Sequence, residues 1–283
     1  MERKELKEVV ESHCKQLKRS LGGREISLIM PLSQEEEDQL KEGSGNAEKE
    51  YIFADSSTAL GINYFSLYKE THPECELKYE WKEESPLWVG GKSNLDIWIK
   101  EGNVIKVYES KFLEPYYMSN SKFTSSYFDS KYYKMDKKVA RRLINRIENI
   151  DYKEFTYYNI SQLIRHLIAI FNHIYINPNK YNDIHEVQLV SICWEMPEQF
   201  VDDLCSVVGK RSISYLRKRI AKLSTERKLS EKYINNIIKD ILQPELEKNL
   251  KVNLLYKTDS YNDAITNIKN SKHIEDFKEQ YYL

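Results

Sequence analysis

Two runs of alternating apolar and polar residues lie close together near the middle of the chain, Ser93–Lys100 and Val104–Phe112. The short polar link between them contains Gly102, and such a link between alternating runs is typical of a β-hairpin. Side chains on a strand point alternately to opposite faces, so residues two apart share a face. The pattern therefore predicts that Glu109 and Lys111 lie side by side at the end of an otherwise apolar face.

Asp96 lies on the first of these strands, so two carboxylates and an ammonium group are expected near one another. Carboxylate oxygens suit a hard cation such as Mg²⁺, which can activate a water and stabilise charge on a phosphate. The alternating run Glu76–Trp81 predicts a neighbouring strand, from which Glu80 could either add a third acidic ligand or face solvent. The simpler interpretation of the pattern is a cross-strand ion pair, worth about 0.2–1 kcal/mol.

Asp96 followed by Glu109-Ser110-Lys111 on the next strand resembles the PD-(D/E)XK nuclease superfamily, although Leu95 stands where many members carry proline. Local matches at 56–65, 109–115 and 162–166 are similar to a group of bacterial proteins regarded as restriction endonucleases, and they cover about residues 50–195. The resemblance implies an α/β (α+β) fold of the restriction-endonuclease type, with a mixed central sheet flanked by helices.

The resemblance also implies roles for individual residues. Asp96 and Glu109 would hold Mg²⁺, for which Mn²⁺ would substitute, and Lys111 would position or activate the attacking water. Gln162 is similar to the first residue of a Gln-x-x-x-Tyr motif found in some of these nucleases and would orient the site, while His166 stands where the tyrosine would be. Residues four apart on a helix share a face, so Gln162 and His166 are expected to point the same way.

Apolar spacing over the rest of the chain predicts helices over 2–21, 56–70 and 158–176 and a buried strand over 187–194. The acidic, Gly/Ser-rich residues 33–50 favour a surface loop, and a mainly helical pattern with one short strand at 252–257 follows Pro197. We therefore predict three parts: an N-terminal helix and mobile acidic loop (1–50), a nuclease core (51–195) and a mainly helical C-terminal extension packed on the core (196–283).

The formal net charge is −1, so a nucleic-acid partner would have to be met by local basic patches. Two clusters are candidates for contact with double-stranded DNA, one directly after the predicted hairpin and one between residues 210 and 228. The same residues would also suit solvated helix faces. The candidate DNA contacts are Lys134, Lys137, Lys138, Arg141, Arg142, Arg217 and Arg219.

The remaining composition narrows the class of protein. No run of eighteen apolar residues and no signal-peptide pattern occurs, so no membrane partner is expected. The four scattered cysteines favour reduced thiols in a cytoplasmic protein over disulfides or a zinc site. Restriction enzymes often dimerise, so a homodimer is compatible with the resemblance, although no interface signature is evident.

The sequence thus predicts a Mg²⁺-dependent DNA endonuclease of restriction or defence type. One alternative is a non-catalytic nucleic-acid-binding or assembly protein on the same fold, although binding alone has no need of carboxylates that repel phosphate. Another is an unrelated α/β protein in which the three charged residues form an ion network, which a buried Glu109 without a cavity beside it would favour. A nuclease acting on RNA also fits, because the charged residues indicate phosphate and metal but not the sugar.

Overall fold

The computed structural model describes residues 2–20, 28–42, 53–81, 86–87, 91–92, 95–118, 122–130, 133, 135–208 and 210–283. Its core is a mixed sheet of five strands in the order β1-β4-β5-β6-β7. The strands are β1 (Glu76–Trp81), β4 (Leu95–Glu101), β5 (Val104–Lys111), β6 (Glu186–Cys193) and β7 (Asn253–Ser260), and a separate short pair comprises β2 (Pro86–Leu87) and β3 (Gly91–Lys92). β1, β4 and β5 are antiparallel, whereas β5, β6 and β7 run parallel. The predicted α+β class with a mixed central sheet is confirmed.

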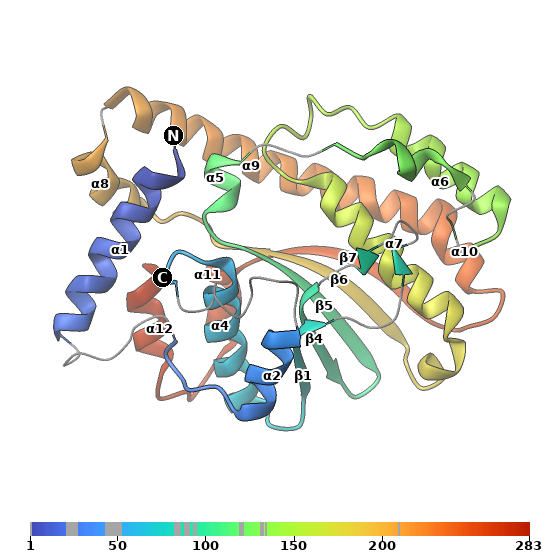
Figure 1. The fold of residues 1–283 in the computed structure, drawn as a ribbon, viewed down its shortest axis with the longest axis horizontal. Coiled ribbons are helices and arrows are strands. Elements are labelled where there is room, and N and C mark those ends of the chain that lie inside the picture. The colour runs from blue at the N-terminus through green and yellow to red at the C-terminus, as the bar shows by residue number, and fades with distance from the viewer. Residues whose placement is uncertain are drawn as a thin grey trace.

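Helices cover both faces of this sheet (Figure 1). On one face, α4 (Ser57–Thr71) packs through the ring of Phe65, whose centroid lies 4.7 Å from that of Tyr108 on β5. On the other face lies α7 (Ile160–Ile176), and His173 on this helix contacts the ring of Trp81 edge-on. The remaining helical segments are α1 (Arg3–Ser20), α2 (Gln34–Glu42), α5 (Glu114–Tyr117), η1 (Ser125–Phe128), α6 (Lys137–Glu148), η3 (Pro178–Tyr181), α8 (Glu198–Val207), α9 (Lys210–Ile237), η4 (Ile238–Leu242), α10 (Gln243–Leu246), α11 (Tyr261–Ala264), η5 (Ile265–Asn267) and α12 (Ile274–Tyr281).

The central hairpin forms as its sequence predicts. Glu101 pairs with Val104 across the turn, so Gly102 and Asn103 form a two-residue loop. Gly102 has φ +57°, a left-handed conformation that costs glycine little because it has no Cβ. The two strands therefore meet in a fixed register, which decides which side chains of β4 and β5 lie opposite each other.

Gly102→Ala is expected to lower the free energy of unfolding by about 1 kcal/mol, because an L side chain disfavours the left-handed region. A Cβ at this position would meet no atom within 4 Å, so the cost is conformational and not steric. Urea denaturation would measure it, with Gly102→Asn as the control that loses less because asparagine tolerates this conformation better. An alanine variant as stable as the wild type would contradict this account.

Side chains from α9 and α10 cover the outer edge of β7, which would otherwise expose unpaired backbone groups. The N–H groups of Leu254 and Tyr256 donate to the side-chain oxygens of Gln243 and Asn235, each at 3.0 Å. The N–H of Thr258 donates to Glu231 at 3.3 Å. These acceptors bond to the N–H group of every second residue, because only every second residue of an edge strand points its backbone N–H away from the sheet.

The C-terminal part of the chain is more than an extension packed on the core. β7 pairs with β6 over eight residues, from Glu186↔Asn253 to Cys193↔Ser260, so it is a full strand of the central sheet. The predicted boundary between residues 195 and 196 therefore does not separate two structural units. Only six residues, 252–257, were predicted as strand, because Asp259 and Ser260 interrupt the apolar alternation.

The prediction of a loop over residues 33–50 is wrong for its first part, where Gln34–Glu42 form α2. Ser33 and Glu36 make a capping box, in which Ser33 Oγ accepts the N–H of Glu36 at 3.3 Å and the Glu36 carboxylate accepts the N–H of Ser33 at 2.8 Å. Leu40 is buried and α2 packs against β1. Residues 43–50 lie outside the described residues.

None of the helices in the described ranges has both the length and the apolar character needed to cross a membrane.

Candidate active site

The site is built around Glu109 and Lys111, whose side chains point from β5 to the face of the sheet that α7 covers. Lys111 Nζ lies 2.5 Å from Glu109 Oε1. The Glu109 side chain is only 2% exposed and that of Lys111 21% exposed, so the ammonium group lies nearer to solvent than the carboxylate. Strand alternation alone places the two residues on one face, as the sequence predicts.

Asp96 lies on β4, and the register that pairs Ile97 with Tyr108 puts Asp96 opposite Glu109. One oxygen of Asp96, Oδ2, accepts the backbone N–H of Ser110 at 2.7 Å. The short turn at Gly102 is what brings these acidic residues onto adjacent strands. Two of the predicted catalytic carboxylates are therefore neighbours in the sheet.

The charges of Asp96, Glu109 and Lys111 change one another's pKa values. Burial alone would raise the pKa of Glu109, but the charges of Lys111 and His166 outweigh burial and lower the pKa to about 2. Burial opposes the charge of Lys111 as well, yet Glu109 and Asp96 raise its pKa above the ordinary lysine value. Burial, together with the negative charge of Glu109, raises the pKa of Asp96 well above its ordinary value. The site thus holds an ionised Glu109, a protonated Lys111 and a destabilised negative charge on Asp96.

Glu80 occupies the position on β1 that the β1–β4 register places opposite Asp96. Its φ of +49° is unusual for a residue with a side chain and interrupts the regular pairing between the strands. Its charge also contributes to the raised pKa of Asp96. Glu80 therefore lies within electrostatic range of Asp96, and its assignment as a third metal ligand stays a prediction.

Gln162 reaches the site from the first turn of α7. Its Nε2 donates to Glu109 Oε1 at 2.6 Å, although the two residues are 53 positions apart. Asn159 is the N-cap of α7, since its Oδ1 accepts the Gln162 N–H at 3.2 Å and its Nδ2 donates to Gln162 Oε1 at 3.3 Å. Asn159 was not among the predicted site residues, although asparagine just before an apolar helix is a recognisable capping signal.

His166, one turn further along α7, lies on the same side as Gln162. Its Nε2 is 2.9 Å from Glu109 Oε2, an ion-pair distance. This contact contributes to the low pKa of Glu109. Both positions of the predicted Gln-x-x-x-His pair therefore contact the same carboxylate.

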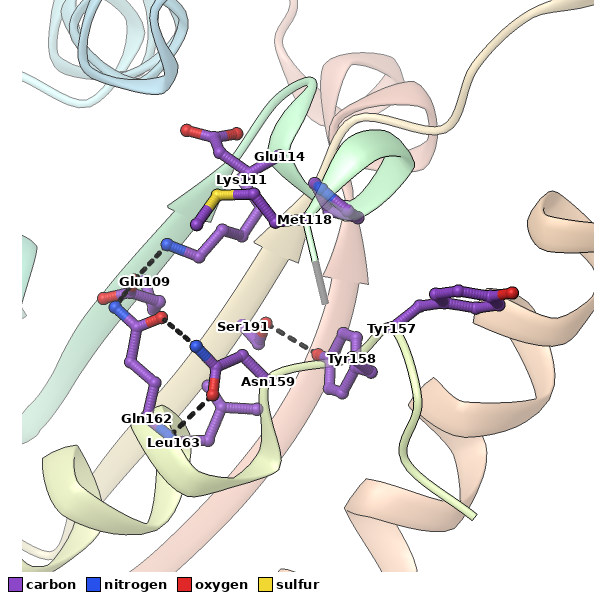
Figure 2. A pocket seen from close by; sticks show the side chains of 11 residues that line it. Glu109, Lys111, Glu114, Met118, Tyr157, Tyr158, Asn159, Gln162, Leu163 and Ser191 are labelled. Atoms are coloured by element: carbon purple, nitrogen blue, oxygen red, sulfur yellow. Dashed lines mark hydrogen bonds and ion pairs between the residues drawn. The ribbon is translucent and has the colours of Figure 1, made fainter. Parts of the chain in front are cut away.

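A cavity of about 280 Å³ opens beside these residues (Figure 2). Glu109, Lys111 and Gln162 are among the polar residues that line it, as Glu114 and Ser191 are, and Figure 2 shows the side chains of the first three converging there. Pro115 and Met118 from the segment after β5 line it as well, and so do Tyr157–Asn159 from the segment directly before α7. A buried Glu109 with such a cavity next to it differs from the arrangement expected of a purely structural ion network.

Among the described residues, no three His, Cys, Asp or Glu side chains are already grouped as a metal site. The donor types nevertheless fit a hard cation, because the carboxylates on β4 and β5 lie opposite each other and the charge of Glu109 raises the pKa of Asp96. A bound cation would relieve that repulsion. Asp96 and Glu109, with Glu80 nearby, are the residues that could hold it.

The basic residues predicted to contact DNA fall into different environments. Lys134 lies outside the described residues. Lys137, Lys138, Arg141 and Arg142 are exposed on α6, which packs against η4 at the C-terminal end of α9 (Figure 1). Arg142 donates to the backbone oxygen of Asp240 at 2.5 Å. Of the described residues, those lining the cavity include none from α6, so closeness in sequence does not place α6 at the site.

The two candidates on α9 differ sharply. Arg217 is exposed and pairs with Glu198. Arg219 is only 6% exposed, and its guanidinium donates to the carbonyl oxygens of Pro115 and Met118 and lies 4.1 Å from the ring centroid of Tyr157. The prediction that Arg219 contacts DNA is therefore corrected: its donors are used inside the protein, where they fix the segment that follows β5.

Comparison with models of protein families found no match, and searches of curated proteins and of solved structures likewise found none.

Proposed function

We propose that this chain is a metal-dependent nuclease that hydrolyses phosphodiester bonds in DNA. The observation that carries the proposal is the convergence of Glu109, Lys111 and Gln162 on one cavity, with Asp96 on the neighbouring strand. Gln162 is remote in sequence, so its contact with Glu109 at 2.6 Å does not follow from the strand pattern and independently supports the arrangement that the resemblance implies. A restriction or defence role rests on that resemblance alone.

Asp96 and Glu109 are the proposed ligands of Mg²⁺, with Glu80 as a third candidate, and Mn²⁺ would substitute. When bound, the cation would supply a water of lowered pKa and positive charge beside the phosphate.

Lys111 acts as a hydrogen-bond donor and a positive charge, because Glu109 and Asp96 raise its pKa and it keeps its proton at neutral pH. It can therefore orient an attacking water or stabilise negative charge on the phosphate, but it does not accept the proton of that water. Gln162 holds Glu109 Oε1 in place, while His166 Nε2 lies 2.9 Å from Glu109 Oε2, so contacts to both oxygens fix the orientation of the carboxylate. The exposed basic residues of α6 and Arg217 remain candidates for contact with the DNA backbone.

Asp96→Asn and Glu109→Gln test the assignment of the carboxylates. Each substitution keeps the shape of the side chain and removes its charge, so each is expected to lower metal-dependent cleavage by at least about 100-fold while DNA binding is retained. Cleavage of duplex DNA and of RNA of the same sequence would be measured at several Mg²⁺ concentrations, beside binding without metal. Metal-dependent cleavage that survives in both variants would rule out these residues as the metal ligands.

A further inference from the structure

Glu226 is a buried carboxylate on α9 that the proposed chemistry does not use. Its side chain is 1% exposed, yet it accepts three successive backbone N–H groups, from Thr156 at 2.9 Å, Tyr157 at 2.8 Å and Tyr158 at 2.7 Å. Three donors directed at one carboxylate compensate much of the cost of burying its charge. Lys222 Nζ, 3.6 Å from Glu226 Oε1, adds an opposite charge at the surface side.

The three residues held in this way lead directly into the candidate active site. Tyr158 precedes Asn159, the N-cap that bonds to both the backbone N–H and the side chain of Gln162. Gln162 in turn donates to Glu109. Short contacts thus run without a break from Glu226 to Glu109, and Figure 2 shows the last two of them, from Asn159 to Gln162 and from Gln162 to Glu109.

A second contact from α9 restrains the opposite wall of the cavity. Arg219 lies seven residues before Glu226, two helical turns away on the same side of α9. Its bond to the carbonyl of Pro115 at 2.9 Å holds the segment after β5, and its contact with the Tyr157 ring links that segment to the start of α7. Both walls of the cavity are therefore attached to one helix.

We propose that Glu226 is a positioning residue, which sets the Gln162 amide against Glu109 by fixing the backbone of residues 156–158. The inference rests on the proposed nuclease function, since its consequence is a correctly oriented Glu109. Glu226 itself does not line the cavity, so it acts only through the segment that it holds. In a Glu226→Gln variant the side chain keeps one oxygen that can accept a hydrogen bond. Its NH₂ group would face a backbone N–H group, and two donors cannot bond to each other.

A double-mutant cycle tests this inference. Glu226→Gln is expected to lower the single-turnover cleavage rate about 10- to 100-fold, as loss of a supporting contact does in other sites, with DNA affinity changed less than about twofold. If Glu226 acts through Gln162, adding Glu226→Gln to a Gln162→Leu variant should cause little further loss. Losses that multiply in the double variant would overturn the inference.

Glu245→Gln is the matched control, because Glu245 is also buried, at 5% exposure, but lies on α10 and pairs with Lys248. All variants would be assayed at a temperature where circular dichroism shows them fully folded. Glu245→Gln should leave the cleavage rate unchanged, and an equal loss in this control would show a general effect of destabilisation and overturn the inference.

A measurement that does not depend on activity separates the inference from the proposed function. The side-chain amide resonance of Gln162, assigned by NMR, should shift in Glu226→Gln and stay in place in Glu245→Gln, because only the former loosens the contact with Glu109. If the resonance shifts in Glu226→Gln but the wild-type protein cleaves no nucleic acid, the positioning role is kept and the nuclease function is rejected. An unmoved resonance would reject the positioning role whatever the activity.

Discussion

Lys111→Met is expected to reduce Mg²⁺-dependent cleavage by about 100- to 1,000-fold, the range associated with loss of a positioned hydrogen-bond donor or charge at a reacting centre. Methionine keeps the length of the side chain but cannot donate to Glu109 Oε1 or stabilise charge on a phosphate. Cleavage would be measured under single-turnover conditions, with the fraction of folded protein checked in parallel.

Lys106→Met is the matched control for this prediction. Lys106 lies on the same strand and also pairs with a glutamate, since its Nζ is 2.9 Å from Glu101 Oε2, but it does not line the cavity. We expect this variant to cleave at nearly the wild-type rate. Equal losses in the two variants would mean that Lys111 acts only through the stability of β5.

Arg219→Met is expected to lower the free energy of unfolding by about 2–5 kcal/mol, because it leaves the carbonyl oxygens of Pro115 and Met118 without the donor that they have in the folded state. The stacking of the guanidinium on Tyr157 is lost as well. Urea denaturation followed by circular dichroism would measure the change.

Arg217→Met, two residues earlier on α9, provides the comparison for Arg219. Arg217 is about half exposed and its ion pair with Glu198 is at the surface, so its loss should cost less than about 1 kcal/mol. If Arg217 contacts a phosphate of DNA, the same variant should also bind DNA more weakly, and its binding should depend less on salt concentration. The opposite result, a large loss of stability at Arg217 and none at Arg219, would contradict the placement of both side chains.

Local rules were sufficient to predict the hairpin that carries the candidate site. Alternation along β4 and β5 and a glycine at the turn fix both the register and the shared face of Glu109 and Lys111, because each depends only on neighbouring residues. The capping box of α2 was also present in the sequence, as Ser33 followed by Glu36, but the acidic and Gly/Ser-rich composition around it favoured a loop.

Residues that act across long distances in the chain could not be assigned in this way. Arg217 and Arg219 are both arginines in one basic helix, and only the packing of α9 on the segment after β5 makes one exposed and the other buried. Glu226 likewise appears in the sequence as a lone acid among lysines and arginines. Its role depends on backbone N–H groups about seventy residues away, which no local pattern predicts.

The contact of Gln162 with Glu109 could be predicted only in part. The helical spacing predicts that Gln162 and His166 share a face, but it does not predict which strand that face meets. The resemblance implied only that Gln162 would orient the site, and the structure brings its amide to 2.6 Å from Glu109.

We propose that the chain cleaves nucleic acid with the help of a metal ion held at Asp96 and Glu109. The most direct test is incubation of supercoiled plasmid and linear phage DNA with the purified full chain, with Mg²⁺, with Mn²⁺ or with EDTA. We predict cleavage with either cation and none with EDTA. Intact DNA under every condition, from a folded protein at concentrations well above that of the substrate, would contradict the claim.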